Sequence, residues 1–145
     1  MKQTKQSALL RAASALTLVF CAAHTYTILD PSSRDPEEAA VFMAMQAYPF
    51  RIMGFRRTHW DFYRGYSLLF SVTLLLLAVL LWQLGAVARS DPARARPLIA
   101  TLFAAYLAFT VLCGLYFFTA PAALSAAAAI CLALAFTASG TGPSR

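Results

Sequence analysis

Residues 67–88, SLLFSVTLLLLAVLLWQLGAVA, form a run of 22 residues without a charged side chain. Such a run, in helical geometry, is long enough to cross a bilayer, whose hydrocarbon core needs about 20 apolar residues. Trp82 lies near the end of the run, where an aromatic ring is favoured at the membrane interface. This stretch therefore predicts a transmembrane helix, around which the rest of the chain can be interpreted.

The composition of the chain agrees with a membrane protein. Of its 145 residues, 60% are hydrophobic and 12% are charged, whereas soluble domains are about 45–50% apolar. The formal net charge is +6, but the basic residues are scattered at the ends of apolar runs rather than gathered on a soluble basic face. We interpret them as topology signals and expect no nucleic-acid partner.

Three further apolar runs predict the remaining spans. They cover residues 12–29, 97–118 and 122–138. With a long loop at 30–66, the chain is predicted to be a single, all-α integral membrane domain with four transmembrane helices in an antiparallel bundle. In the third span, Ala104, Ala108 and Gly114 are small residues suited to close helix approach. The alanine-rich fourth span should also pack closely, which is compatible with a homo-oligomer.

The first span follows the basic residues Lys2, Lys5 and Arg11. A basic start before an apolar run also describes a signal peptide, with a weak cleavage site at Cys21–Ala23. Because the apolar run continues to Leu29, we expect this segment to be retained as a span.

The long loop contains a helix signal of its own. Asp35 can cap a helix, Pro36 suits its first turn, and Glu37 and Glu38 favour its positive end. The helix should continue to about Tyr48. Its body is apolar nearly all round, so it should be a short interfacial helix or lie against the end of the bundle.

The distribution of charge predicts the orientation, because Lys and Arg collect in short cytoplasmic loops. With the N-terminus inside, the inner segments carry seven bases and one acid: Lys2, Lys5, Arg11, Arg89, Arg94, Arg96 and Arg145 against Asp91. The loop at 30–66 carries five bases and five acids: Arg34, Arg51, Arg56, Arg57 and Arg64 against Asp30, Asp35, Glu37, Glu38 and Asp61. We therefore expect a multi-pass protein of a bacterial inner membrane, with both termini cytoplasmic and this loop outside.

The stretch before the second span, RIMGFRRTHWDFYRGY at 51–66, concentrates polar and aromatic side chains. Thr58 and Asp61 have the spacing of a capping box, with Asp in place of the usual Glu or Gln. If a helix begins near Thr58, five side chains share one of its faces. These are Trp60, Tyr63, Arg64, Ser67 and Ser71. Asp61 and Arg64, three residues apart, can form a pair.

His24 is the ionisable residue that lies within a predicted span. It stands five residues before Leu29, about 7–8 Å inside the end of the helix. An ionisable side chain within a span is costly and is often functional. It could approach Tyr63, Arg64 or Ser67 if the first and second spans are neighbours.

Two interpretations of these residues stay open. In the first, they form a polar pocket in the outer leaflet: His24 is a base or ligand-binding group, Asp61 orients it, and Arg64 recognises an anion or a carbonyl. Trp60, Tyr63 and Ser67 would then complete the ligand-binding set. In the second, Thr58 and Asp61 start the helix, while the arginines and aromatic rings anchor it among lipid headgroups.

Other site chemistries are less favoured. Haem binding by His24 and His59 would require both histidines within facing spans, and His59 is expected outside. The three cysteines fall in apolar runs with no CxxC pair or Cys/His cluster, so no metal site is predicted. The identity of any cofactor is left open.

The chain resembles a group of small, uncharacterised bacterial membrane proteins with four predicted helices. The resemblance rests on a histidine late in the first span, His24, on the segment Ala44-Met45-Gln46, and on residues 60–65, WDFYRG. It implies the four-helix topology and offers no established activity.

The sequence thus predicts a small membrane protein that contacts lipids and binds a lipophilic small molecule or a membrane partner at the polar pocket. The alternative is an integral membrane enzyme, an isomerase or an oxidoreductase, acting on a lipid-soluble substrate through His24, Asp61 and Arg64. Transport is less favoured because the spans contain few polar positions.

Overall fold

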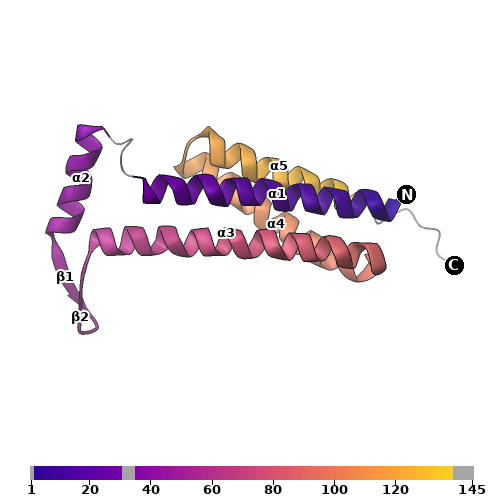
Figure 1. Cartoon of the computed structure of the whole chain (residues 1–145), viewed down its shortest axis with the longest axis horizontal. Coiled ribbons are helices and arrows are strands. Elements are labelled where there is room, and N and C mark those ends of the chain that lie inside the picture. Colours follow the sequence, from indigo (N-terminus) through magenta and orange to yellow (C-terminus); the bar gives the residue numbers. More distant parts are fainter. Residues whose placement is uncertain (1, 31–34, 139–145) are drawn as a thin grey trace. The chain divides into compact units, whose positions relative to one another are not determined.

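A computed structural model describes residues 2–30 and 35–138 (Figure 1). Its helices are α1 (Lys2–Leu29), α2 (Pro36–Ala47), α3 (His59–Ser90), α4 (Pro92–Tyr116) and α5 (Thr119–Ala138), and its strands are β1 (Pro49–Ile52) and β2 (Phe55–Thr58). Residue 1, residues 31–34 of the predicted loop and the C-terminal residues 139–145 lie outside the described residues.

Four helices, α1, α3, α4 and α5, are long and apolar enough to cross a membrane. Large apolar side chains such as Leu69, Val72 and Leu115 are more than 60% exposed on them. A continuous exposed apolar surface is unfavourable in water and is typical of proteins that contact lipid. The number of long apolar helices therefore confirms the prediction of a mostly helical, multi-pass membrane protein.

The helix boundaries differ from the predicted spans. α1 begins at Lys2 rather than near residue 12, and α3 begins at His59 rather than at residue 67. Pro97, predicted to open the third span, lies inside α4, and α5 begins at Thr119. Hydropathy marks only the part of a helix that suits hydrocarbon, whereas helical hydrogen bonding continues into the polar flanks until a cap or a turn stops it.

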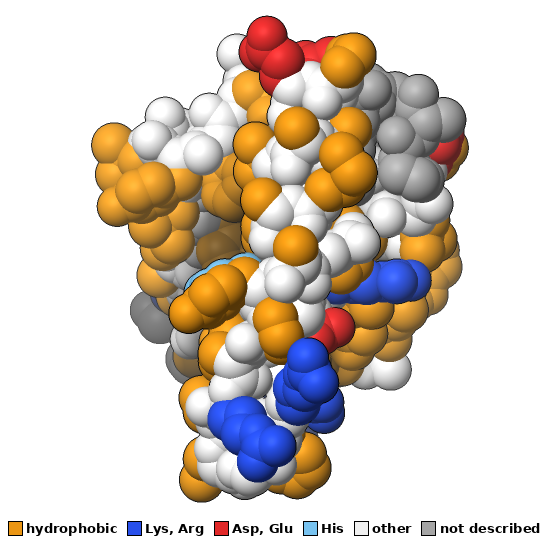
Figure 2. All heavy atoms as spheres, turned by 90° about the vertical axis from the view of Figure 1, so that its left-hand side faces the viewer, with side chains coloured by type: hydrophobic (Ala, Val, Ile, Leu, Met, Phe, Trp, Pro, Cys, Tyr) orange, Lys and Arg blue, Asp and Glu red, His pale blue; other side chains and the backbone are white. Residues whose placement is uncertain are grey.

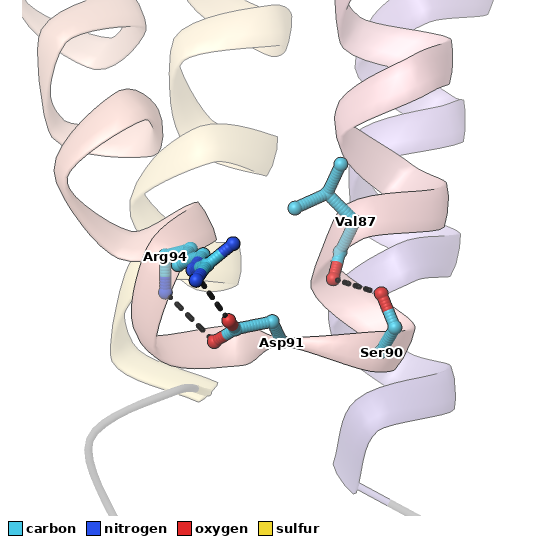
Figure 3. Close-up of polar contacts among 4 residues, drawn as sticks. All are labelled: Val87, Ser90, Asp91 and Arg94. Carbon is cyan, nitrogen blue, oxygen red and sulfur yellow. Dashed lines mark hydrogen bonds and ion pairs between the residues drawn. The ribbon is translucent and has the colours of Figure 1, made fainter.

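The turn between α3 and α4 shows such a stop (Figure 3). Ser90 Oγ donates to the carbonyl of Val87 at 3.2 Å, which satisfies one backbone acceptor at the end of α3. Asp91 then caps α4, accepting a hydrogen bond from the Arg94 backbone N–H at 3.1 Å. The same carboxylate forms an ion pair with Arg94 Nε at 3.0 Å. One residue therefore separates two long helices.

The chain divides into two compact units, which are described separately. The helical unit comprises Met1–Phe20 and Leu74–Arg145, and the hairpin unit comprises Cys21–Thr73. The boundary between them falls within α1 and within α3.

The helical unit has a core of small side chains. Six of the twelve residues in its buried cluster are alanines: Ala13, Ala88, Ala95, Ala128, Ala129 and Ala135. The alanines of α5 let it pack closely against α4, as predicted. In α4, however, Ala104, Ala108 and Gly114 are exposed, so their predicted role in close packing is wrong within this chain. The buried positions of α4 are instead Ala95, Ile99, Tyr106 and Cys113.

Two hydrogen bonds between polar side chains or backbone groups connect helices within the helical unit. Ser14 Oγ donates to the carbonyl of Ala78 at 2.7 Å, and the hydroxyls of Thr17 and Tyr106 are 2.6 Å apart. Both contacts join different helices. In an apolar environment such hydrogen bonds help to hold neighbouring helices together.

The hairpin unit contains a short helix and two strands where the sequence predicted a short helix and a loop. The helix α2 is capped by Asp35, whose side chain accepts from the Glu38 N–H at 2.8 Å, as the sequence indicated. The strands β1 and β2 are antiparallel. Met53 and Gly54 connect them with φ values of 49° and 86°, the two positive values that a type I′ hairpin turn requires. The prediction of an all-α fold is therefore wrong at this hairpin.

Candidate functional site

The start of α3 positions the candidate site. The backbone N–H of Thr58 donates to Asp61 Oδ2 at 2.8 Å, and the backbone N–H of Asp61 donates to Thr58 Oγ1 at 3.1 Å. This reciprocal pair is the predicted capping box, with Asp as the partner. The interpretation of Thr58 and Asp61 as a helix start is confirmed, and it fixes the direction in which β2 leads into α3.

An aromatic cluster joins α2 to α3. The ring of Phe42 packs edge-on against Trp60, with centroids 5.0 Å apart, and lies 5.6 Å from Tyr63. Trp60 and Tyr63 stack on each other at 5.5 Å. Trp60 and Tyr63, which the sequence predicts to bind a ligand, therefore pack against Phe42 of α2.

A second set of rings joins β1 to the start of α3. His59 lies against Tyr48, at 6.4 Å, and against Phe50, at 5.0 Å. Phe50 also contacts Phe62, at 5.6 Å. These contacts turn one face of the hairpin toward α3.

A pocket of about 630 Å³ lies between that hairpin face and α3. Its walls are Ile52, Met53, Phe55, Arg57, Asp61, Phe62, Gly65, Tyr66 and Leu69. Two of these side chains, Arg57 and Asp61, are charged, and most of the others are apolar. This combination, an apolar wall with a few polar groups, is the usual composition of a small-molecule site.

The charged side chains of the pocket are held in place by local contacts. Arg57 Nη1 donates to the carbonyl of Arg56 at 2.8 Å, and its guanidinium lies 5.5 Å from the ring centroid of Phe55. Asp61 uses Oδ2 for the capping box. The middle of the α3 wall is open because Gly65 has no side chain, and an added Cβ there would meet no atom within 4 Å.

His24 lies apart from these pocket walls, on a polar seam between α1 and α3 within the hairpin unit. Its Nε2 is 3.1 Å from the backbone carbonyl of Ser67, and its ring packs edge-on against Phe70 at 5.0 Å. A carbonyl oxygen only accepts hydrogen bonds, so Nε2 carries the proton. In the neutral ring, Nδ1 is then left as an acceptor, and no hydrogen bond to it is found among the described residues.

The seam continues through small polar side chains. Thr25 Oγ1 donates to Ser71 Oγ at 3.0 Å, and Cys21 Sγ donates to the carbonyl of Ser71 at 3.3 Å. Ser71 Oγ in turn lies 3.3 Å from the carbonyl of Ser67. The first two of these bonds join α1 to α3.

The structure brings only some of the predicted site residues together. His24 meets Ser67 through its backbone, as the helix geometry suggested. Asp61 lines the pocket. Arg64 is exposed, and no ion pair between Asp61 and Arg64 is found in the described part of the chain.

Of the nine residues that line the pocket, the sequence predicts one, Asp61, as a site residue. Arg57 is predicted only as a headgroup contact, because its approach to α3 depends on the hairpin. Phe62, Tyr66 and Leu69 follow one another at helical spacing, four and then three residues apart, and so share one face of α3. This spacing is the signal that could have identified the pocket wall.

Among the described residues, no three His, Cys, Asp or Glu side chains are grouped so that they could hold a metal ion. Comparisons of the chain with protein-family models, with curated proteins and with solved structures found no match. The resemblance to small four-helix membrane proteins therefore stays a prediction.

Substitutions at Asp61 separate its capping role from a role in the pocket. We expect Asp61→Ala to remove one bond of the capping box and destabilise the first turn of α3 by about 1 kcal/mol. Amide hydrogen exchange in that turn should therefore become about fivefold faster. Asp61→Asn keeps an acceptor oxygen and should change exchange less. Normal exchange combined with complete loss of a copurifying ligand in Asp61→Asn would show that the charge serves the pocket.

Proposed function

We propose that this chain is a small inner-membrane protein that binds a lipophilic small molecule in the pocket between the hairpin and α3. The observation that carries this proposal is the pocket itself: about 630 Å³, with a mostly apolar wall and two charged side chains. Small-molecule sites are usually clefts of about 300–1,000 Å³ with this kind of lining.

The position of the pocket on α3 favours a ligand that arrives from the membrane. Gly65, Tyr66 and Leu69 belong to the helix whose next residues form the most apolar span of the chain. A ligand with an apolar body could lie along these residues, while a polar end group could accept from Arg57 or donate to Asp61. Membrane-soluble compounds with one polar end fit this arrangement better than soluble polar metabolites.

The proposed setting is the outer leaflet of a bacterial inner membrane. Both termini are cytoplasmic, the four long helices form an antiparallel bundle, and α2 lies in the membrane interface. The excess of seven bases over one acid in the inner segments supports this orientation. The exposed apolar side chains of α2, such as Val41 and Met43, support its contact with lipid. Self-association through exposed helix faces is compatible with this arrangement.

Filling the pocket at Gly65 tests the proposal. We expect Gly65→Leu to occupy the open space in the α3 wall and to abolish retention of the ligand, measured by mass spectrometry of small molecules that copurify in mild detergent. The substitution should not weaken the helix, because leucine has a higher helix propensity than glycine by up to about 1 kcal/mol.

Gly114→Leu is the matched control. Gly114 is also a helical glycine with no atom within 4 Å of an added Cβ, and it is in α4 and not among the residues that line the pocket. It should retain the ligand at the wild-type level. No specific small molecule in the wild-type protein, or equal retention by Gly65→Leu, would contradict the proposal.

Cysteine labelling tests the orientation. In a variant lacking Cys21, Cys113 and Cys131, we expect a membrane-impermeant thiol reagent to label Glu37→Cys in intact cells with a permeable outer membrane. Ser90→Cys should be labelled only after the inner membrane is opened. Both positions are exposed in the structure, so accessibility within the protein is matched. The reverse pattern would invert the topology.

The alternative function is an integral membrane enzyme, an isomerase or an oxidoreductase. One observation favours it: the bond from His24 to the Ser67 carbonyl leaves Nδ1 as an acceptor within a span. A backbone carbonyl that orients the ring in this way is a common support for a general base. Because His24 does not line the pocket, the substrate of such an enzyme would have to reach the polar seam.

His24→Gln distinguishes binding from catalysis. Glutamine can keep a donor toward Ser67 but has no basic nitrogen. If the protein only binds, the molecule that copurifies should be unchanged. If His24 acts as a base, the variant should instead retain the unreacted substrate, seen as an isomer for an isomerase or as a compound differing by two hydrogen atoms for an oxidoreductase.

A further inference from the structure

The β-hairpin presents two different faces. The register pairs Phe50 with Arg57 and Ile52 with Phe55, while Arg51 lies directly opposite Arg56. Since side chains alternate across a strand, the first four share one face and the two arginines share the other. The first face turns toward α3, where it forms a wall of the pocket. Arg51 and Arg56 therefore point away from α3.

Arg51 and Arg56 form an unneutralised pair. Both side chains are exposed, and no ion pair joins either of them to an acid among the described residues. Like charges directly opposite each other destabilise a pair of strands. The pair is stabilised when an anion lies between the two guanidinium groups, and phosphate matches their planar donor geometry.

The turn that lies between the two arginines in the chain is apolar. Met53 is 93% exposed, and Phe55 and Ile52 are 63% and 45% exposed. Figure 2 looks onto α2 and the hairpin and shows basic and hydrophobic side chains side by side at the hairpin end, with acidic side chains at the opposite end of α2. An apolar tip beside a basic pair is the arrangement of a segment that enters a lipid interface.

The connection to α3 places the hairpin at the correct depth for such contact. β2 ends at Thr58 and α3 begins at His59, with no residue between them. α3 has 32 residues and is about 48 Å long, longer than the hydrocarbon core of about 30 Å. Its first turns, which contain Trp60, Tyr63 and Tyr66, have the aromatic composition of the membrane interface. The hairpin is joined directly to this interfacial part.

We propose that Arg51 and Arg56 form a clamp for the headgroup phosphate of anionic phospholipids in the leaflet that α3 enters, with the Met53–Gly54 turn inserted among the acyl chains. The clamp is on the face opposite the pocket and does not depend on the pocket ligand. A soluble phosphate compound would satisfy the arginines but would leave the apolar tip in water. The lipid satisfies both.

Quenching by brominated lipids measures this contact. In a Trp82→Phe protein, Trp60 is the remaining tryptophan and reports on lipid near the hairpin. In mixed vesicles, brominated phosphatidylglycerol should quench Trp60 more strongly than brominated phosphatidylcholine does. We expect each arginine to increase this preference by about fivefold, which corresponds to ~1 kcal/mol per basic residue near an anionic surface. Arg51→Gln with Arg56→Gln should remove most of this preference.

Two comparison variants control for charge and folding. Arg89→Gln with Arg94→Gln removes the same charge from the end of α3 and the start of α4, and should leave the preference at Trp60 unchanged. Arg51→Lys with Arg56→Lys keeps the charge and should retain part of the preference, which separates loss of lipid binding from loss of the hairpin fold.

Three outcomes would overturn the proposal. The first is a full preference in the double glutamine variant. The second is an equal loss in the Arg89 and Arg94 control, which would indicate a general effect of net charge. The third is abolition of the preference by inorganic phosphate, but not by chloride of equal ionic strength, which would assign the clamp to a soluble anion.

Discussion

The capping box between Thr58 and Asp61 is the interaction on which the hairpin unit depends. It is the point where extended backbone becomes helix, with each residue satisfying the other's backbone N–H. Because no linker separates β2 from α3, the geometry of this junction sets the angle of the hairpin. That angle in turn brings Phe50 onto Phe62 and opens the pocket beside Gly65.

Asp61 illustrates how a structural group can also belong to a site. One carboxylate oxygen holds the helix start, and the side chain also lines the pocket. Arg57 has a comparable dual position, since its guanidinium contacts the Arg56 carbonyl and the Phe55 ring while facing the pocket. Polar groups already held by the fold are preorganised for a ligand and lose little conformational entropy when it binds.

The polar seam and the pocket place two kinds of chemistry in the hairpin unit. The seam joins two apolar helices through the hydrogen bonds of His24 with Ser67 and of Thr25 with Ser71. These bonds stabilise helix contact whether or not His24 has a chemical role. The pocket, by contrast, has a mostly apolar wall that includes two charged side chains, Arg57 and Asp61, as is usual for a small-molecule site.

The sequence by itself determined the features that depend on local composition and spacing. Four uncharged runs predict helices, because only internally hydrogen-bonded segments suit hydrocarbon, and Asp35, Thr58 and Asp61 predict helix starts through cap chemistry. Only the tertiary structure decided where Arg57, Phe62 and Tyr66 meet. Their pocket depends on the hairpin, and the Met53–Gly54 turn of this hairpin carries no strong sequence signal. The hairpin packs on α3 through contacts between aromatic rings. The sequence of one segment predicts which of its own polar groups must form hydrogen bonds within that segment. A site between segments depends on the angles between them, which the sequence of no single segment specifies.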